Sequence, residues 1–438
     1  MAMKTGSWTL ALFFLVTALA GRHSPGQQSP IQWPVPPPGP PRPVHDAAAP
    51  PRVLIGAPEL AAALAAGAIP LDAADLGGDP DGDLDGLRAR LAGLGISGRE
   101  TVVVHGADRA AVARAYRLLR WAGCAEVRVL DGGRAAGPDL ETRARRPAAA
   151  VFRPDARGGE AAADAGWIAG TFAQAGVQLL DVRDVRGWDH WETPPTFAAG
   201  HIPYSLPFDP RALLAAGDGW PDPEAVRGYF ASFGPRPGDP VRLDSTFVLY
   251  GEDARDPRPD LGYLLLSLAG LDARVFPGGW KEWKADGARP VVRVVSAADL
   301  AARLRQENPG LAADRPPRGL LLFDLREPRD FAIGHLPGAL SLPFLHFSDD
   351  FGKAVAAGWP GADRATMPLV LYCYGIDCVR SRKAGAQAAS LGFRDVLWFR
   401  GGVEEWRQAG YPLLDSPLPT PSPSARERDV PADGDGRP

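Results

Sequence analysis

The 438-residue sequence has few cysteines and no marked excess of charge of either sign. Its three cysteines, Cys124, Cys373 and Cys378, are too few for a disulfide-rich scaffold, and they form neither a CxxC pair nor a Cys/His spacing typical of zinc sites. The 48 basic residues stand against 52 acidic ones, for a net charge of −4, without a basic stripe or a lysine-rich arm. The sequence therefore implies no metal, no organic cofactor and no nucleic-acid partner.

Long apolar runs are also scarce. One run, residues 8–20, is shorter than the ~20 residues that a bilayer-spanning helix needs. Lys4 precedes it and Ala18-Leu19-Ala20 ends it, which predicts a cleaved secretory signal over residues 1–20, with an uncleaved anchor as the alternative. We expect a periplasmic or secreted protein with no membrane contact beyond export.

Two further segments have little to bury. Residues 21–50 are rich in proline, which predicts an extended linker. Residues 416–438 are equally poor in apolar residues, which predicts a disordered tail.

Between these segments a pattern recurs three times. A phrase that reads as helix end, strand and glycine pair ends at Gly133, Gly279 and Gly402. Successive pairs are 146 and 123 residues apart, which suits one small domain each. Strands that alternate with helices predict an α/β fold, in which each domain is a small, mostly parallel sheet with helices on both faces. The expected domains are residues 51–145, 151–290 and 291–415.

The most informative stretch is a strand, a loop and a helix in the third repeat. Residues 369–372 form a short apolar run typical of a buried strand, and the spacing of Ala384, Ala388 and Leu391 predicts a helix that stops at Gly392. The loop between them begins at Cys373. Loop amides and a helix N-terminus stabilise a thiolate, so Cys373 is a candidate nucleophile; the alternative is a small buried hydrophobe.

The corresponding loops of the other repeats lack a cysteine. The first repeat places His105 at or near the cysteine position, and the second places Gly251 there. We expect catalysis in the third domain alone.

Several phrases in the third repeat carry a family resemblance. These are Asp324-x-Arg326 at a strand end, the phrase AIGHLPGA around His335, the cysteine loop, and the Gly-Gly-x-x-x-Trp close at residues 401–406. In this order the sequence resembles the rhodanese family, as three tandem rhodanese-like domains over about residues 50–415. The first domain is the most divergent.

The resemblance implies a sulfurtransferase. Cys373 would take sulfane sulfur from a small donor such as thiosulfate, carry it as a persulfide, and pass it to cyanide or a thiol, including a protein thiol. Arg380 would hold the donor's oxyanion, while Asp324 and His335 (like His201 in the second repeat) would be structural. The implied active-site loop comprises Tyr374, Gly375, Ile376, Asp377, Cys378, Val379 and Ser381.

The loop departs from the family pattern in length. Six residues separate Cys373 from Arg380, whereas the family usually has four and phosphatases of the same fold have five. Phosphatase chemistry is therefore an alternative, although Asp377 would disfavour a dianionic phosphate ester.

Three points stay open from the sequence. Cys378 is either a buried loop residue or a thiol that pairs with Cys373, which would make the protein a thiol–disulfide or sulfur-relay protein. Arg326 and Arg329 either line the pocket mouth or pair with Asp324 and Glu327. A non-catalytic interaction scaffold is the third functional alternative.

Overall fold

The computed structural model describes residues 52–77, 83–132, 149–155, 160–183, 193–214, 219–234, 240–346, 351–352, 355 and 363–416. The predicted signal and linker lie outside these ranges, as does the predicted tail except for its first residue. Within them, no helix combines the length and the apolar character required to cross a bilayer.

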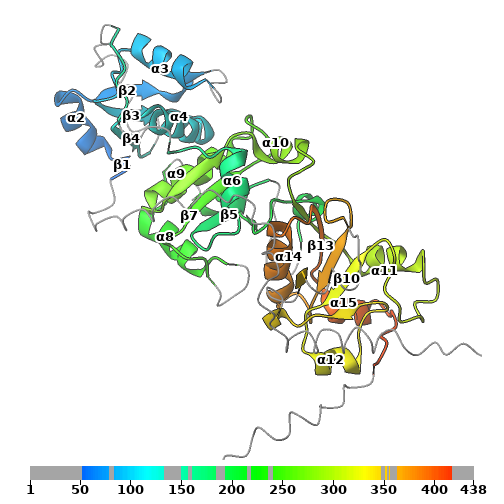
Figure 1. Cartoon of the computed structure of the whole chain (residues 1–438). Coiled ribbons are helices and arrows are strands. Elements are labelled where there is room, and N and C mark those ends of the chain that lie inside the picture. The colour runs from blue at the N-terminus through cyan, green and yellow to red at the C-terminus, as the bar shows by residue number, and fades with distance from the viewer. Residues whose placement is uncertain are drawn as a thin grey trace, which may run out of the picture.

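Three parallel sheets follow one another along the chain, and the second lies between the first and the third (Figure 1). The first has the order β1 (Leu54–Ile55), β4 (Glu126–Leu130), β3 (Thr101–His105), β2 (Ile69–Asp72). The second has the order β6 (Leu206–Pro207), β5 (Val177–Asp181), β7 (Thr246–Tyr250), β8 (Ala273–Phe276). The third has the order β11 (Leu340–Ser341), β10 (Leu321–Asp324), β12 (Leu369–Tyr372), β13 (Asp395–Phe399), β9 (Val291–Val294).

Helices connect these strands in each domain. The first domain contains α2 (Ala57–Ala65), η1 (Ala73–Leu76), α3 (Leu84–Gly93) and α4 (Arg109–Ala122). The second contains α6 (Ala165–Thr171), α7 (Pro195–Ala199), η3 (Pro210–Leu213), α8 (Pro223–Ser232), α9 (Arg258–Leu268) and α10 (Gly279–Ala285). The third contains α11 (Ala297–Arg305), α12 (Pro328–Ile333), η4 (Phe344–His346), α14 (Arg380–Ser390) and α15 (Gly402–Gln408).

Both faces of the third sheet are covered. All four residues of β12 are buried, and they alternate between two apolar clusters. Leu369 and Leu371 pack in the cluster that holds Ala384 and Ala388 of α14, whereas Val370 and Tyr372 face the cluster of α11 and α15. A strand buried on both faces reads as a continuous apolar run, as its sequence does. The expected α/β fold of small parallel sheets with helices on both faces is confirmed.

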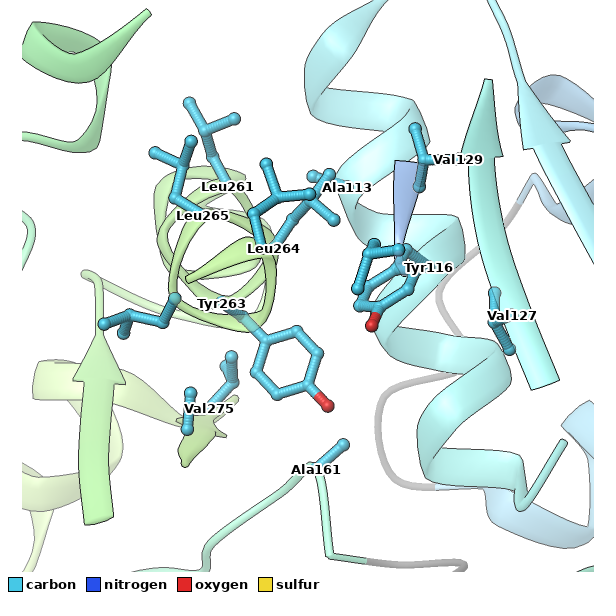
Figure 2. Close-up of a cluster of buried hydrophobic side chains, with 14 of the residues drawn as sticks. Ala113, Tyr116, Val127, Val129, Ala161, Leu261, Tyr263, Leu264, Leu265 and Val275 are labelled. Carbon is cyan, nitrogen blue, oxygen red and sulfur yellow. The ribbon is translucent and has the colours of Figure 1, made fainter. Parts of the chain in front are cut away.

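The domains share apolar cores with their neighbours. Figure 2 shows α4 of the first domain facing α9 of the second, where the rings of Tyr116 and Tyr263 lie 6.0 Å apart. A second continuous cluster joins the second and third sheets. His201 also exchanges two backbone hydrogen bonds with Val292 of β9, so the second domain is tied directly to the third sheet.

The chain between the first two domains pairs with the first. The amides of Arg153 and Asp155 donate to the carbonyls of Ser97 and Gly123, both at 2.8 Å. We expected the second domain to begin at residue 151, but these bonds attach residues up to 155 to the first domain.

The recurring glycine pairs position the loops at the sheet edge. Gly402 has φ +55°, and a Cβ there would lie 2.3 Å from the Cys373 carbonyl oxygen; Gly279 has φ +60°, and a Cβ there would lie 2.6 Å from the Gly251 carbonyl oxygen. Because glycine occupies these positions, the amides of Val403 and Trp280 can donate to those carbonyls, at 3.1 and 2.9 Å. The glycines therefore hold the first residue of each loop in place.

Candidate active site

Cys373 lies at the carboxyl edge of the third sheet, directly after β12. Its side chain is almost fully buried, with 1% of the residue exposed. The loop that follows makes a turn in which the Cys378 amide donates to the Gly375 carbonyl at 3.0 Å, and it ends at Arg380, the first residue of α14. The loop therefore connects the buried cysteine to the N-terminus of an 11-residue helix.

Cys373 is joined to Cys378 in a disulfide, with the two Cα atoms 6.3 Å apart. Cys378 is half-buried, whereas Cys373 is buried. The third cysteine, Cys124, is free and buried in the first domain, and burial raises the pKa of its thiol to about 12. Of the three cysteines, two are therefore oxidised to a disulfide and the third is a buried thiol of the first domain.

A cleft between the second and third domains opens beside Cys378. Arg382 of α14 crosses it and donates to the Tyr204 carbonyl at 2.8 Å. Arg400, which follows β13, donates to the Thr193 hydroxyl at 2.8 Å. Sequence reasoning missed both arginines, because their role depends on a neighbouring domain; the position of Arg400 directly before the glycine pair was the one available signal. The cleft lining includes Ser205 and Pro207 from the second domain and Ile376, Cys378, Val379 and Trp398 from the third.

Trp398, which lines the cleft, is held by Ser381. Ser381 is fully buried in the first turn of α14, and its hydroxyl accepts a hydrogen bond from the Trp398 indole at 2.9 Å. The predicted loop residues Ile376, Cys378 and Val379 come together at this cleft. Asp377 is exposed, and Gly375 is buried beneath Glu404.

Tyr374 and Arg380 lie on the other side of the loop. The Tyr374 hydroxyl donates to Asp330, and the Arg380 guanidinium lies 5.9 Å from the centre of the tyrosine ring. Arg380 also donates to Glu327 at 3.4 Å, with both side chains over one third exposed. The guanidinium is therefore held at the surface of the loop by Glu327 and the Tyr374 ring.

Arg326 and Arg329 have different surroundings. Arg326 is 5% exposed and forms a bidentate pair with Asp324, with its Nη2 at 2.6 Å from Oδ2 and 2.6 Å from the Gly334 carbonyl. Of the two roles predicted for Arg326, the structure gives it the ion pair, and it is not among the side chains lining the cleft. Arg329 is exposed on α12 and also lies outside the lining.

His335 and His201 occupy the same place in successive domains. Each is buried and stacked on a phenylalanine four residues earlier, with Nδ1 donating to that residue's carbonyl at 3.0 Å. His335 Nε2 lies 3.1 Å from an Asp314 carboxylate oxygen. Burial lowers the pKa of His201 to about 3, so its ring is neutral. These contacts orient a turn, and among the described residues no group of three or more His, Cys, Asp or Glu side chains could hold a metal ion.

His105 stands one residue before the cysteine position. In the strand register His105 lies opposite Asp72 of β2, just as Tyr372 lies opposite Asp324 in the third sheet. The residue of the first domain that corresponds to Cys373 is therefore Gly106.

Known proteins share this sequence pattern. The model of the rhodanese-like domain family matches residues 164–286 and 296–409, which leaves the first domain outside the match. The putative thiosulfate sulfurtransferase SseB of Mycobacterium tuberculosis is 32% identical over 215 residues, 47% of this chain and 72% of that protein. Thiosulfate sulfurtransferase GlpE of Pseudomonas fluorescens is 36% identical over 95 residues, 22% of this chain and 76% of that protein. Among solved structures, wild-type EanB aligns with a TM-score of 0.42 at 18% identity, over 55% of this chain and 68% of that one.

Proposed function

We propose, since this chain belongs to the rhodanese-like domain family, that its third domain is a sulfurtransferase that carries sulfane sulfur on Cys373. The observation that carries the proposal is the position of this thiol. It directly follows a buried strand and begins a loop that ends at Arg380, the first residue of α14, whose guanidinium is more than one third exposed. The names of two similar proteins, thiosulfate sulfurtransferases, support the same reaction class.

The reaction has two displacements. The Cys373 thiolate attacks the sulfane sulfur of thiosulfate, the sulfur–sulfur bond of the donor breaks, and sulfite leaves with the electron pair. Cys373 then carries a terminal persulfide anion. A thiophilic acceptor such as cyanide or a thiol attacks the outer sulfur and restores the thiolate. Covalent capture of this kind predicts ping-pong kinetics.

Two features of the site favour the first displacement. The helix N-terminus and the loop amides stabilise negative charge on sulfur, both in the thiolate and in the persulfide. Arg380 attracts the donor dianion and stabilises the departing sulfite through charge-assisted hydrogen bonds. Because Cys373 is bonded to Cys378 in the structure, two thiols must reduce the disulfide, and are themselves oxidised to a disulfide, before the enzyme can react.

A steady-state assay tests the proposal. After reduction and removal of the reductant, the protein should form thiocyanate from thiosulfate when cyanide is in large excess, so that cyanide takes the sulfur before the disulfide forms again. Cys373→Ser should reduce this rate to background, whereas Cys124→Ala, which changes the remaining cysteine of the first domain, should leave it unchanged. A Cys373→Ser protein with normal thiocyanate formation would refute the persulfide mechanism.

The Cys373–Cys378 disulfide supports a second candidate, a thiol–disulfide carrier. A carrier of this kind would exchange the disulfide with a protein dithiol and would not release sulfite from thiosulfate. The release of sulfite by the reduced protein therefore separates the two functions.

Export is the remaining part of the proposal, and residues 1–20 support it through their basic start, apolar run and small-residue end. N-terminal sequencing of the protein recovered from the extracytoplasmic fraction tests it. The expected first residue is Gly21. An intact Met1 in the cytoplasmic fraction would contradict the proposal.

A further inference from the structure

The active-site loop has a structural counterpart in the second domain. Residues 251–258 and 373–380 are loops of equal length, each running from a strand end to an arginine that begins a helix, Arg258 of α9 and Arg380 of α14. Their backbones make matching hydrogen bonds. The first carbonyl of each loop accepts from Trp280 or Val403, and the second carbonyl accepts from the next residue along, at 2.9 and 3.0 Å.

In both loops the residue five positions after the first folds back over the first. In the second domain this residue is Asp256, whose carboxylate covers Gly251 so closely that a Cβ on Gly251 would lie 2.3 Å from Oδ2. In the third domain it is Cys378, whose sulfur is bonded to that of Cys373. The fold of the loop thus places the fifth side chain directly above the position of the nucleophile.

Asp256 shows what chemistry this position favours. Its carboxylate is 4% exposed and accepts from the amides of Glu252 and Arg258 at 3.0 and 3.1 Å. The Arg258 guanidinium adds two hydrogen bonds, at 2.7 and 2.6 Å. Burial would raise the pKa of Asp256, but these hydrogen bonds lower it below its ordinary value. In the second domain the loop therefore forms a binding site for a buried anion, made of two amides and the arginine that begins the helix.

We propose that Cys378 is a second catalytic thiol, which stands where Asp256 stands in the second domain and resolves the Cys373 persulfide with release of hydrosulfide. The proposal rests on the sulfurtransferase function proposed for Cys373. The groups at the equivalent positions in the third domain are the amides of Tyr374 and Arg380 and the Arg380 side chain, which pairs there with Glu327.

The resolving step balances. The Cys378 thiolate attacks the inner sulfur of the persulfide, the Cys373 sulfur. The bond between this atom and the outer sulfur breaks, and the outer sulfur leaves with the electron pair as hydrosulfide after taking the proton lost by Cys378. The sulfane sulfur is reduced and the two cysteine sulfurs are oxidised to a disulfide. The product of this step is the bond that the structure contains.

The cleft determines how the enzyme is reduced again. Cys378 lines the cleft between the second and third domains, whereas Cys373 is buried. An incoming thiol therefore reaches Cys378 first, and attack there releases Cys373 as the thiolate needed for the next turnover. A second thiol then frees Cys378. Over one cycle, thiosulfate and two thiols give sulfite, hydrosulfide and one disulfide.

A single-turnover experiment tests the proposal. The full-length protein is reduced, freed of reductant and mixed with one equivalent of thiosulfate; sulfite, hydrosulfide and intact mass are then measured. The parent protein should release about one equivalent each of sulfite and hydrosulfide and end about 2 mass units below the reduced form. Cys378→Ser and Cys378→Ala should release sulfite but at least tenfold less hydrosulfide, and should retain one sulfur, about 32 mass units, until a thiol is added. Cys124→Ala is the matched control and should behave as the parent.

Two results would overturn the proposal, and they are distinguishable. If the parent protein retains the added sulfur, or if the Cys378 variants release hydrosulfide as the parent does, Cys378 does not resolve the persulfide and the sulfurtransferase function stands. If the parent and the Cys378 variants release no sulfite and gain no sulfur, the proposed function fails together with this inference.

Discussion

The buried ion pair between the first two domains allows a stability prediction from the structure. Asp260 of α9 is 2% exposed and accepts a hydrogen bond from Arg117 of α4, which is 1% exposed; Arg114 lies 3.6 Å from the same carboxylate. Asp260→Ala removes the carboxylate but leaves the Arg117 guanidinium in the shared core. Leaving a buried cation without its partner lowers the free energy of unfolding far more than breaking a surface ion pair does.

The expected loss in the free energy of unfolding is about 3–5 kcal/mol. The first two domains together are of a size at which 1 kcal/mol shifts Tm by about 2–4 °C, so the transition that melts them should fall by roughly 6–20 °C. Differential scanning calorimetry and urea unfolding measure this directly. Because the pair joins α4 of the first domain to α9 of the second, the transition of the third domain should move much less.

A double variant separates charge from packing. Replacing the pair with apolar residues, in Arg117→Met with Asp260→Leu, removes the stranded charge and should recover most of the lost stability. A loss below about 1 kcal/mol for Asp260→Ala alone would refute the argument, because such a value is typical of an exposed pair.

Three further predictions concern the second and third domains. Burial lowers the pKa of His201 from 6.5 to about 3, so between these pH values the unfolded chain binds a proton there that the folded protein does not. The free energy of unfolding should therefore fall as the pH falls from about 6.5 toward 3. Urea titrations should show a smaller fall in the His201→Gln variant. Arg380→Ala should slow sulfite release from thiosulfate by about 10–100-fold in stopped-flow assays, since a charge-assisted hydrogen bond contributes about 1.5–3 kcal/mol, and Arg380→Lys should recover part of the rate; an unchanged rate would exclude a role in donor binding. Arg382→Ala should destabilise the contact between the second and third domains by about 1.5–3 kcal/mol in urea unfolding, whereas Arg242→Ala, which removes a largely exposed pair, should leave stability nearly unchanged.

The sequence predicts the parts of the site that depend on local pattern. The apolar run of β12 and the glycine at residue 402 place Cys373 at a strand end, and both follow from backbone sterics and burial that act over a few residues. The three recurring phrases predict three α/β domains because each repeat must bury the faces of its own sheet.

Contacts between domains could not be predicted in this way. Arg117 lies in a helix among other arginines, a pattern typical of a solvated face, yet α9 buries it. The cleft contacts of Arg382 and Arg400 depend on how the second domain packs against the third. These positions are fixed by surfaces brought together from distant parts of the chain.

The disulfide could be predicted from the sequence only in part. The sequence shows that Cys378 follows Cys373 by five residues, but whether the two sulfurs meet depends on how the loop folds back. The equal length of the loops at 251–258 and 373–380 was a signal available in the sequence. It aligns Asp256 with Cys378, and the structure shows the common backfolded arrangement.

The most direct test of the central claim is the mass of the reduced Cys378→Ser protein before and after thiosulfate. This variant lacks the resolving thiol, so a sulfur bound to Cys373 should persist. We predict a gain of about 32 mass units that maps to the Cys373 peptide and is lost on addition of cyanide, and no gain in the variant that also carries Cys373→Ser. A protein that gains no sulfur, or gains it equally without Cys373, would contradict the persulfide mechanism.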